Sequence, residues 1–204
     1  KEILDLTGAT IDGSIALNAS LEETANLTGA VVNTFDEFGT ADAPKILDQL
    51  TLATQKSALN FEKLNVAIPI ASGAAAAAKV PFSTFIAQLG NASDRGIEAS
   101  TAATSLRNIY IELAAKGLTL EEALAKINTS QDKLTTANDL FGKRAAVTAL
   151  ALANTTKETG KLDEALQSAE GTASKFAGQT LDNLDGSIKL LSSAWEGLVL
   201  SVFR

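Results

Sequence analysis

The feature of this sequence that most restricts its fold is an apolar seam near the end of the chain. Seven apolar residues recur at spacings that alternate between three and four positions, which keeps them on one face of a helix. They are Leu181, Leu184, Ile188, Leu191, Trp195, Leu198 and Val202. The positions that flank the seam are mostly small and uncharged, so a second helix can approach it closely. The seam therefore predicts either docking on the chain's own helices or association between copies of the protein.

The composition favours a helical core and removes several kinds of chemistry. Of the 204 residues, 46% are hydrophobic but only 5% are aromatic, which indicates a core of Ala, Leu, Ile and Val. Because the sequence contains neither Cys nor His, it lacks disulfides, the usual zinc ligands and the commonest general base. The first residue is Lys1 rather than Met, so we expect a piece of a longer chain.

The charge is unevenly distributed along the chain. The net charge is −7, and residues 1–50 account for it with nine acidic residues against two lysines. The remaining residues hold fifteen charges of each sign. An acidic front and a neutral body do not provide the basic surface that a phosphate backbone requires, so we expect no specific nucleic-acid partner.

Helix-start and helix-stop signals recur along the chain, and no stretch shows a convincing strand pattern. Ser20 and Thr119 each precede a Glu by three positions, Asn60 precedes an apolar run, and Gly117 follows one. The sequence predicts an all-α fold, an array of short helices and kinked hairpins ending in a long C-terminal helix with heptad patterning. We expect an acidic loop or edge segment over residues 1–19, a compact helical core over 20–170, and the long helix over 171–204.

Glycine, proline and serine residues predict where the shorter helices are interrupted. Gly8 and Gly13 indicate a loop or a loosely packed edge at the start of the chain. Pro69 lacks a backbone donor and predicts a kink or break in the helix that begins after Asn60. Ser130 is the expected cap of the helix that ends near residue 141, and Gly160 is expected to separate the helix before it from one at 162–169.

The longest uncharged run raises the question of membrane contact. Residues 64–78 carry no charge, but this run of fifteen residues is shorter than the roughly 20 apolar residues of a spanning helix. A tightly packed core helix is the favoured interpretation, with membrane contact as the alternative.

The acidic and basic residues suggest helix capping rather than catalysis. The pairs at 22–23 and 121–122 lie in first turns, where carboxylates favour the positive end of a helix. Asp182, Asp185 and Gly186 lack the alternating ligands of a calcium loop. Arg107 is expected to pair with Glu98 or Glu112. With no phosphate-binding loop or nucleophile elbow, the sequence predicts no catalytic residue, cofactor or metal, and hence no enzyme.

Residues 96–108 resemble the most recognisable motif of phage tail tape-measure proteins. In that family a Gly-Ile pair is followed by a small-residue stretch and a small-Thr-small-Leu-Arg run. The matching positions are Gly96, Ile97, Thr104, Leu106 and Arg107. Ala103 stands where the family commonly has glycine, and both residues allow close packing. The segments 61–78, 140–145 and 181–196 are also similar to family segments, the second of them to a Leu-Phe-Gly turn.

The resemblance implies a structural protein of a phage tail. It would be the core segment of the tape measure, which sets tail length, occupies the tail tube or tip, and is released on infection. The implied partners are further copies of itself as a trimer or hexamer, the tail tube, the tail tip or baseplate hub, tail assembly chaperones and, in some members, the host envelope. The implied location is the virion tail, after synthesis in the host cytoplasm. The alternatives are a membrane-active helical module that uses residues 64–86 during ejection, and a generic helical adaptor.

Overall fold

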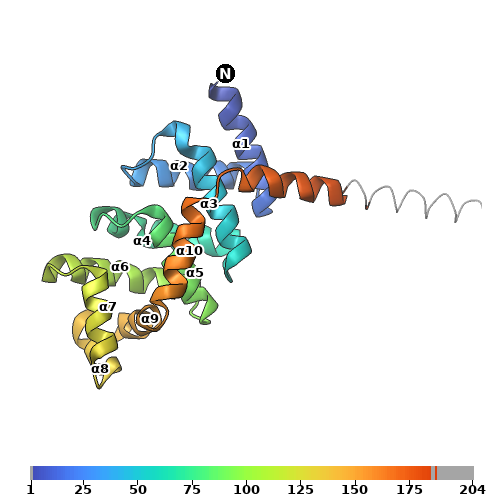
Figure 1. Cartoon of the computed structure of the whole chain (residues 1–204). Coiled ribbons are helices and arrows are strands. Elements are labelled where there is room, and N and C mark those ends of the chain that lie inside the picture. Colours follow the sequence, from blue (N-terminus) through green and yellow to red (C-terminus); the bar gives the residue numbers. More distant parts are fainter. Residues whose placement is uncertain (1, 185–186, 188–204) are drawn as a thin grey trace, which may run out of the picture.

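The computed structural model describes residues 2–184 and Ser187, and all regular structure in that part of the chain is helical. The prediction of an all-α fold is therefore confirmed (Figure 1). The elements in chain order are α1 (Glu2–Leu17), α2 (Leu21–Thr34), the short 3₁₀ helix η1 (Thr40–Asp42), α3 (Ala43–Lys56), α4 (Phe61–Ala77), α5 (Phe82–Asp94), α6 (Ala99–Lys116), α7 (Leu120–Thr129), α8 (Lys133–Phe141), α9 (Lys143–Asn154) and α10 (Thr156–Gln167). A further helix runs over residues 172–184.

The helices pack as neighbouring groups around α5. Helices α1 and α2 pack against α3, and α4 lies along α6. Helices α7, α8 and α9 gather beside α6, at the bottom of Figure 1. Helix α10 then returns across α5 to α3, so the last described helix starts beside the N-terminal group and extends away from the body (Figure 1). A continuous apolar core joins these groups, and its aromatic part centres on Phe35, Phe82 and Phe85.

The prediction of a loop over residues 1–19 is wrong, because α1 occupies almost all of it. Gly13 lies against α3, and a Cβ at this position would be only 2.7 Å from Cδ2 of Leu47. The glycine therefore allows two helices to approach closely instead of marking a turn. Sequence alone does not distinguish these two uses of glycine.

The helix breaks expected at Pro69 and Gly160 do not occur. Helix α4 continues through Pro69, which is exposed, and the carbonyl that loses its donor belongs to Asn65, which is exposed as well. Water can satisfy that carbonyl, so the helix does not break there. Helix α10 likewise continues through Gly160, whose intrinsic cost of about 1 kcal/mol is small beside the packing of α10 on α5.

Two of the predicted caps are confirmed in full, and a third is confirmed in part. The Asn60 side chain accepts the Lys63 N–H at 2.9 Å, and Thr119 with Glu122 forms a complete capping box. The Ser20 hydroxyl accepts the Glu23 N–H, but the Glu23 carboxylate binds that hydroxyl and not the Ser20 backbone.

The cap predicted at Ser130 is misplaced by two residues. Helix α8 is capped by Asp132, whose carboxylate accepts the Thr135 N–H at 3.0 Å. The Ser130 hydroxyl accepts the Asp132 N–H and so shapes the preceding turn.

Candidate functional site

The helix over 172–184 is fixed to the body by one buried carboxylate. Asp48 lies on α3, and its Oδ2 accepts the N–H of Gly171 while its Oδ1 accepts the N–H of Ala173, both at 2.8 Å. Gly171 has a φ of +76°, a left-handed conformation that glycine adopts without strain. These donors belong to the positive end of the helix, where an anion is favourable. Asp48 therefore determines where this helix leaves the body.

Beyond this anchor the helix loses contact with the body. Ala173 and Ala177 are buried, whereas every described residue from Gly178 onward is exposed. Leu181 and Leu184, the first two residues of the predicted seam, are 49% and 56% exposed. The other seam residues, Ile188, Leu191, Trp195, Leu198 and Val202, lie outside the described residues. Two apolar side chains are thus presented on a helix whose start is rigidly held.

The segment that carries the tape-measure-like motif forms a turn and helix α6. Gly96 has a φ of +76° at the end of α5, and the Glu98 carboxylate caps α6 by accepting the N–H groups of Ser100 and Thr101. The hydrogen bond from the Ser100 hydroxyl, followed by that from the Thr101 N–H, lowers the pKa of Glu98. Ile97 and Thr104 are half-buried and Leu106 is completely buried. Most of the motif therefore builds the helix and its packing.

Helices α4 and α6 pack together, and both bury small residues. Ala102 and Ala103 are fully buried on α6, and Ala67, Ala71 and Ala75 are fully buried on α4. Because none of these side chains extends beyond Cβ, the two helix backbones can lie close together. The glycine that the family commonly has at position 103 is consistent with the same close approach.

Arg107 does not make the ion pair that the sequence suggested. It is exposed, and in the part of the chain that the structure describes neither Glu98 nor Glu112 forms a salt bridge with it. Glu98 caps α6, and Glu112 pairs with Lys116 at 2.7 Å. Arg107 is therefore the motif residue whose functional group is directed to solvent.

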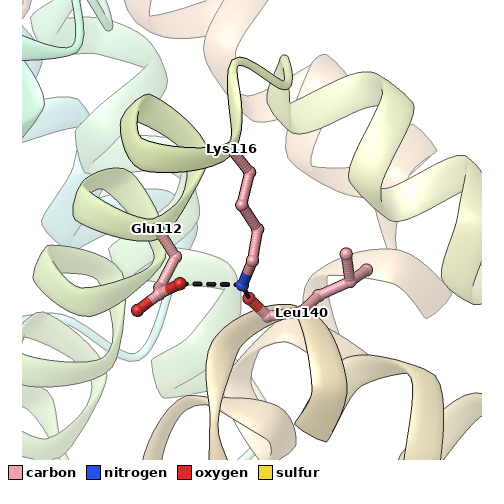
Figure 2. Close-up of polar contacts among 3 residues, drawn as sticks. All are labelled: Glu112, Lys116 and Leu140. Atoms are coloured by element: carbon pink, nitrogen blue, oxygen red, sulfur yellow. Dashed lines mark hydrogen bonds and ion pairs between the residues drawn. The ribbon is translucent and has the colours of Figure 1, made fainter.

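Lys116 connects the motif helix to the Leu-Phe-Gly turn (Figure 2). Its ammonium donates to Glu112 and also to the carbonyl of Leu140, which lies in the last turn of α8. A cation is favourable at this negative helix end. Phe141 is buried, and Gly142 joins α8 to α9 with a φ of +75° and a ψ of 164°, a region occupied almost only by glycine. The Ser105 hydroxyl donates to the carbonyl of Arg144 at 3.2 Å, so the family-like segments 96–108 and 140–145 are in contact.

Glu122, from one of the predicted acidic pairs, and Asp132 each cap the start of a helix. The backbone and hydroxyl of Thr119 lower the pKa of Glu122 by hydrogen bonding, and Thr135 lowers the pKa of Asp132 in the same way. Among the described residues, no three or more carboxylates are grouped so as to hold a metal ion. These residues stabilise helix starts and do not converge on a common cavity.

The uncharged run of α4 contributes most of one face to the core. Leu64, Ala67, Ile68 and Ala71 are buried against neighbouring helices. None of the helices in the described part of the chain combines the length and hydropathy needed to span a bilayer.

The described body consists of helices that bury small residues against one another, and one anchored helix protrudes from it (Figure 1). The chain belongs to the phage-related minor tail protein family, whose model matches residues 1–194. It is thus a structural protein of a phage tail.

A curated relative gives a more specific comparison. The chain is 26% identical over 229 aligned positions to the probable tape measure protein of Escherichia phage P2. The alignment covers 97% of this chain but only 28% of that relative. No solved structure matches the chain significantly.

Proposed function

We propose that this chain is the core segment of a tail tape measure. It folds into a compact body that lies in the tail tube or at the tip, while further helical residues of the parent protein set the tail length. The protein would be released on infection. Family membership and the similarity to a probable tape measure protein support this role. The observation that carries it is the helix over 172–184, which leaves the body with Leu181 and Leu184 exposed.

The compact body and the ruler have different length requirements. A helix rises about 1.5 Å per residue, and an extended ruler uses this rise directly. In the described residues the helices are short and fold back on one another, so deleting one of them does not shorten the body in proportion. On this proposal, length setting belongs to segments of the parent protein outside this chain.

The ruler role predicts a proportional change in tail length. Removing a stretch of predicted helix from the parent protein, outside this chain, should shorten the tail by at most about 1.5 Å per deleted residue. Electron microscopy of purified tails measures this directly. A deletion of the same size that leaves tail length unchanged would contradict the proposal and favour a generic adaptor.

The seam predicts self-association of the protein into a small oligomer. Replacing Leu184 and Leu191 by Asp places charges on the proposed interface and should convert the oligomer to monomer. Leu184 is already half exposed, so this change should leave the folded body intact. Light scattering gives the mass, and Leu134→Asp, at an equally exposed leucine on α8, is the matched control. An unchanged mass for the double variant would contradict a role of the seam in association.

A further inference from the structure

A cavity of about 310 Å³ opens beside the start of the protruding helix. It is formed by η1, the first half of α3, the end of α10 and the turn that follows α10. Its charged and amide residues are Asp42, Lys45, Asp48, Gln49, Gln167 and Glu170. The cavity therefore lies directly against the Asp48 anchor.

The lining of the cavity carries an excess of negative charge, with three carboxylates against one lysine. Three carboxylates line it, and the one lysine in its lining has its ammonium over the ring of Phe38, 5.5 Å from the ring centre. Within the described residues, the ion pair between Lys116 and Glu112 is the one salt bridge, and it lies elsewhere. The lining favours a positively charged occupant.

Gln49 gives a second and independent indication of an occupant. Its side chain is only 3% exposed, and its Oε1 is a buried acceptor with no hydrogen-bond partner. A buried acceptor of this kind is unfavourable until a donor reaches it. The occupant should therefore both carry positive charge and donate hydrogen bonds.

Arg107 has the complementary properties. It is exposed and forms no ion pair within the described residues. Its neighbours on the same face of α6 carry no charge: Thr104 precedes it by one turn, and Ile111, which is 54% exposed, follows it by one. Along α6 itself, this stretch can be buried in a contact without burying another charge. A guanidinium also offers five donors in a plane, which suits carboxylate and amide oxygens.

We propose that Arg107 of one copy enters this cavity on a second copy. The inference rests on the self-association in the proposed function and adds a second contact to it. Helix α6 packs mainly against α4, α9 and α5, whereas the cavity is formed by η1, α3 and the end of α10 (Figure 1). A contact between two different surfaces is head-to-tail, and such contacts close into rings when the rotation permits.

A charge exchange in the full chain tests the contact. Glu170 is the suitable cavity residue because it is exposed and forms no hydrogen bond or ion pair among the described residues. Arg107→Glu and Glu170→Arg should each weaken association by about tenfold or more, and the two together should restore most of it. Analytical ultracentrifugation over a range of concentrations measures the dissociation constant. Arg95→Glu, an equal charge change at another exposed arginine, is the control and should have little effect.

The outcomes separate this contact from the seam. Restoration in the double variant, with no effect of the control, supports the contact. Single variants that associate like the original protein, or a double variant that is no better than the singles, overturn it. If the seam variant at positions 184 and 191 still dissociates in that case, self-association stands without this contact. If the original protein is monomeric at every concentration, both self-association and this inference are wrong.

Discussion

Replacing Asp48 by Ala should release the helix over 172–184 from the body and destabilise the fold by roughly 2–5 kcal/mol. The substitution removes both acceptors of the Gly171 and Ala173 N–H groups, and the bond to Ala173 is buried. Hydrogen bonds to a charged group contribute about 1.5–3 kcal/mol each, and a donor left buried without a partner adds to the loss. Amide hydrogen exchange at residues 171–177 should accelerate, and thermal unfolding should shift to lower temperature.

Two variants control this experiment. Asp48→Asn keeps one acceptor oxygen and should give an intermediate loss, because one of the two N–H groups then faces an amide donor. Asp36→Ala removes an exposed carboxylate and should change stability by less than about 0.5 kcal/mol. If the amide hydrogens of residues 171–177 exchanged at the same rate in the Asp48→Ala variant as in the original protein, the Asp48 carboxylate would not be the anchor.

The role of Asp48 could not be predicted from the sequence. Its two partners lie 123 and 125 residues further along the chain, and no local pattern connects them. One signal was present, because Asp48 follows Ile46 and Leu47 directly and precedes Leu50 within an apolar helix. A carboxylate in such a place must find donors if it is buried. The sequence does not say where those donors are.

Local signals explain what the sequence did predict. Asn60, Thr119 and Gly117 act on groups within a few residues, so their roles as caps follow from spacing alone. The prediction of a loop at the start of the chain failed because the deciding contact there is distant in sequence. The need for glycine at position 13 comes from its contact with Leu47 on α3, a helix that begins thirty residues further along the chain. A glycine that permits close packing cannot be told from a glycine that permits a turn by its place in the sequence.

In the candidate site, too, local features could be predicted from the sequence, whereas contacts between distant residues could not. Ala102, Leu106 and Ile109 are spaced four and three positions apart in the sequence, as on one face of a helix, and the structure buries all three on α6. It also suggested a carboxylate partner for Arg107, since Glu98 and Glu112 are near in sequence. The capping of α6 by Glu98 and the pairing of Glu112 with Lys116 are decided by neighbouring backbone and by α8. The free guanidinium follows from those tertiary contacts.

Leu106 and Arg107 are adjacent motif residues, but substitutions at the two positions should affect the stability of the fold very differently. Leu106 is completely buried, so Leu106→Ala should destabilise the fold by about 2–5 kcal/mol through lost burial and a residual cavity. For a chain of this length that corresponds to a fall in melting temperature of roughly 4–20 °C. Arg107→Ala should change the free energy of unfolding by no more than about 0.5 kcal/mol, because the side chain is exposed.

Thermal and denaturant unfolding of the two variants, together with tail assembly in the parent phage, separate folding from contact. Leu106→Ala should reduce assembly in proportion to the loss of folded protein, and growth at lower temperature should partly restore it. Arg107→Ala should leave folded protein unchanged, so any loss of assembly comes from a missing contact and does not recover on cooling. Equal destabilisation by both substitutions would mean that Arg107 supports the fold. In that case its place in the motif would need no partner to explain it.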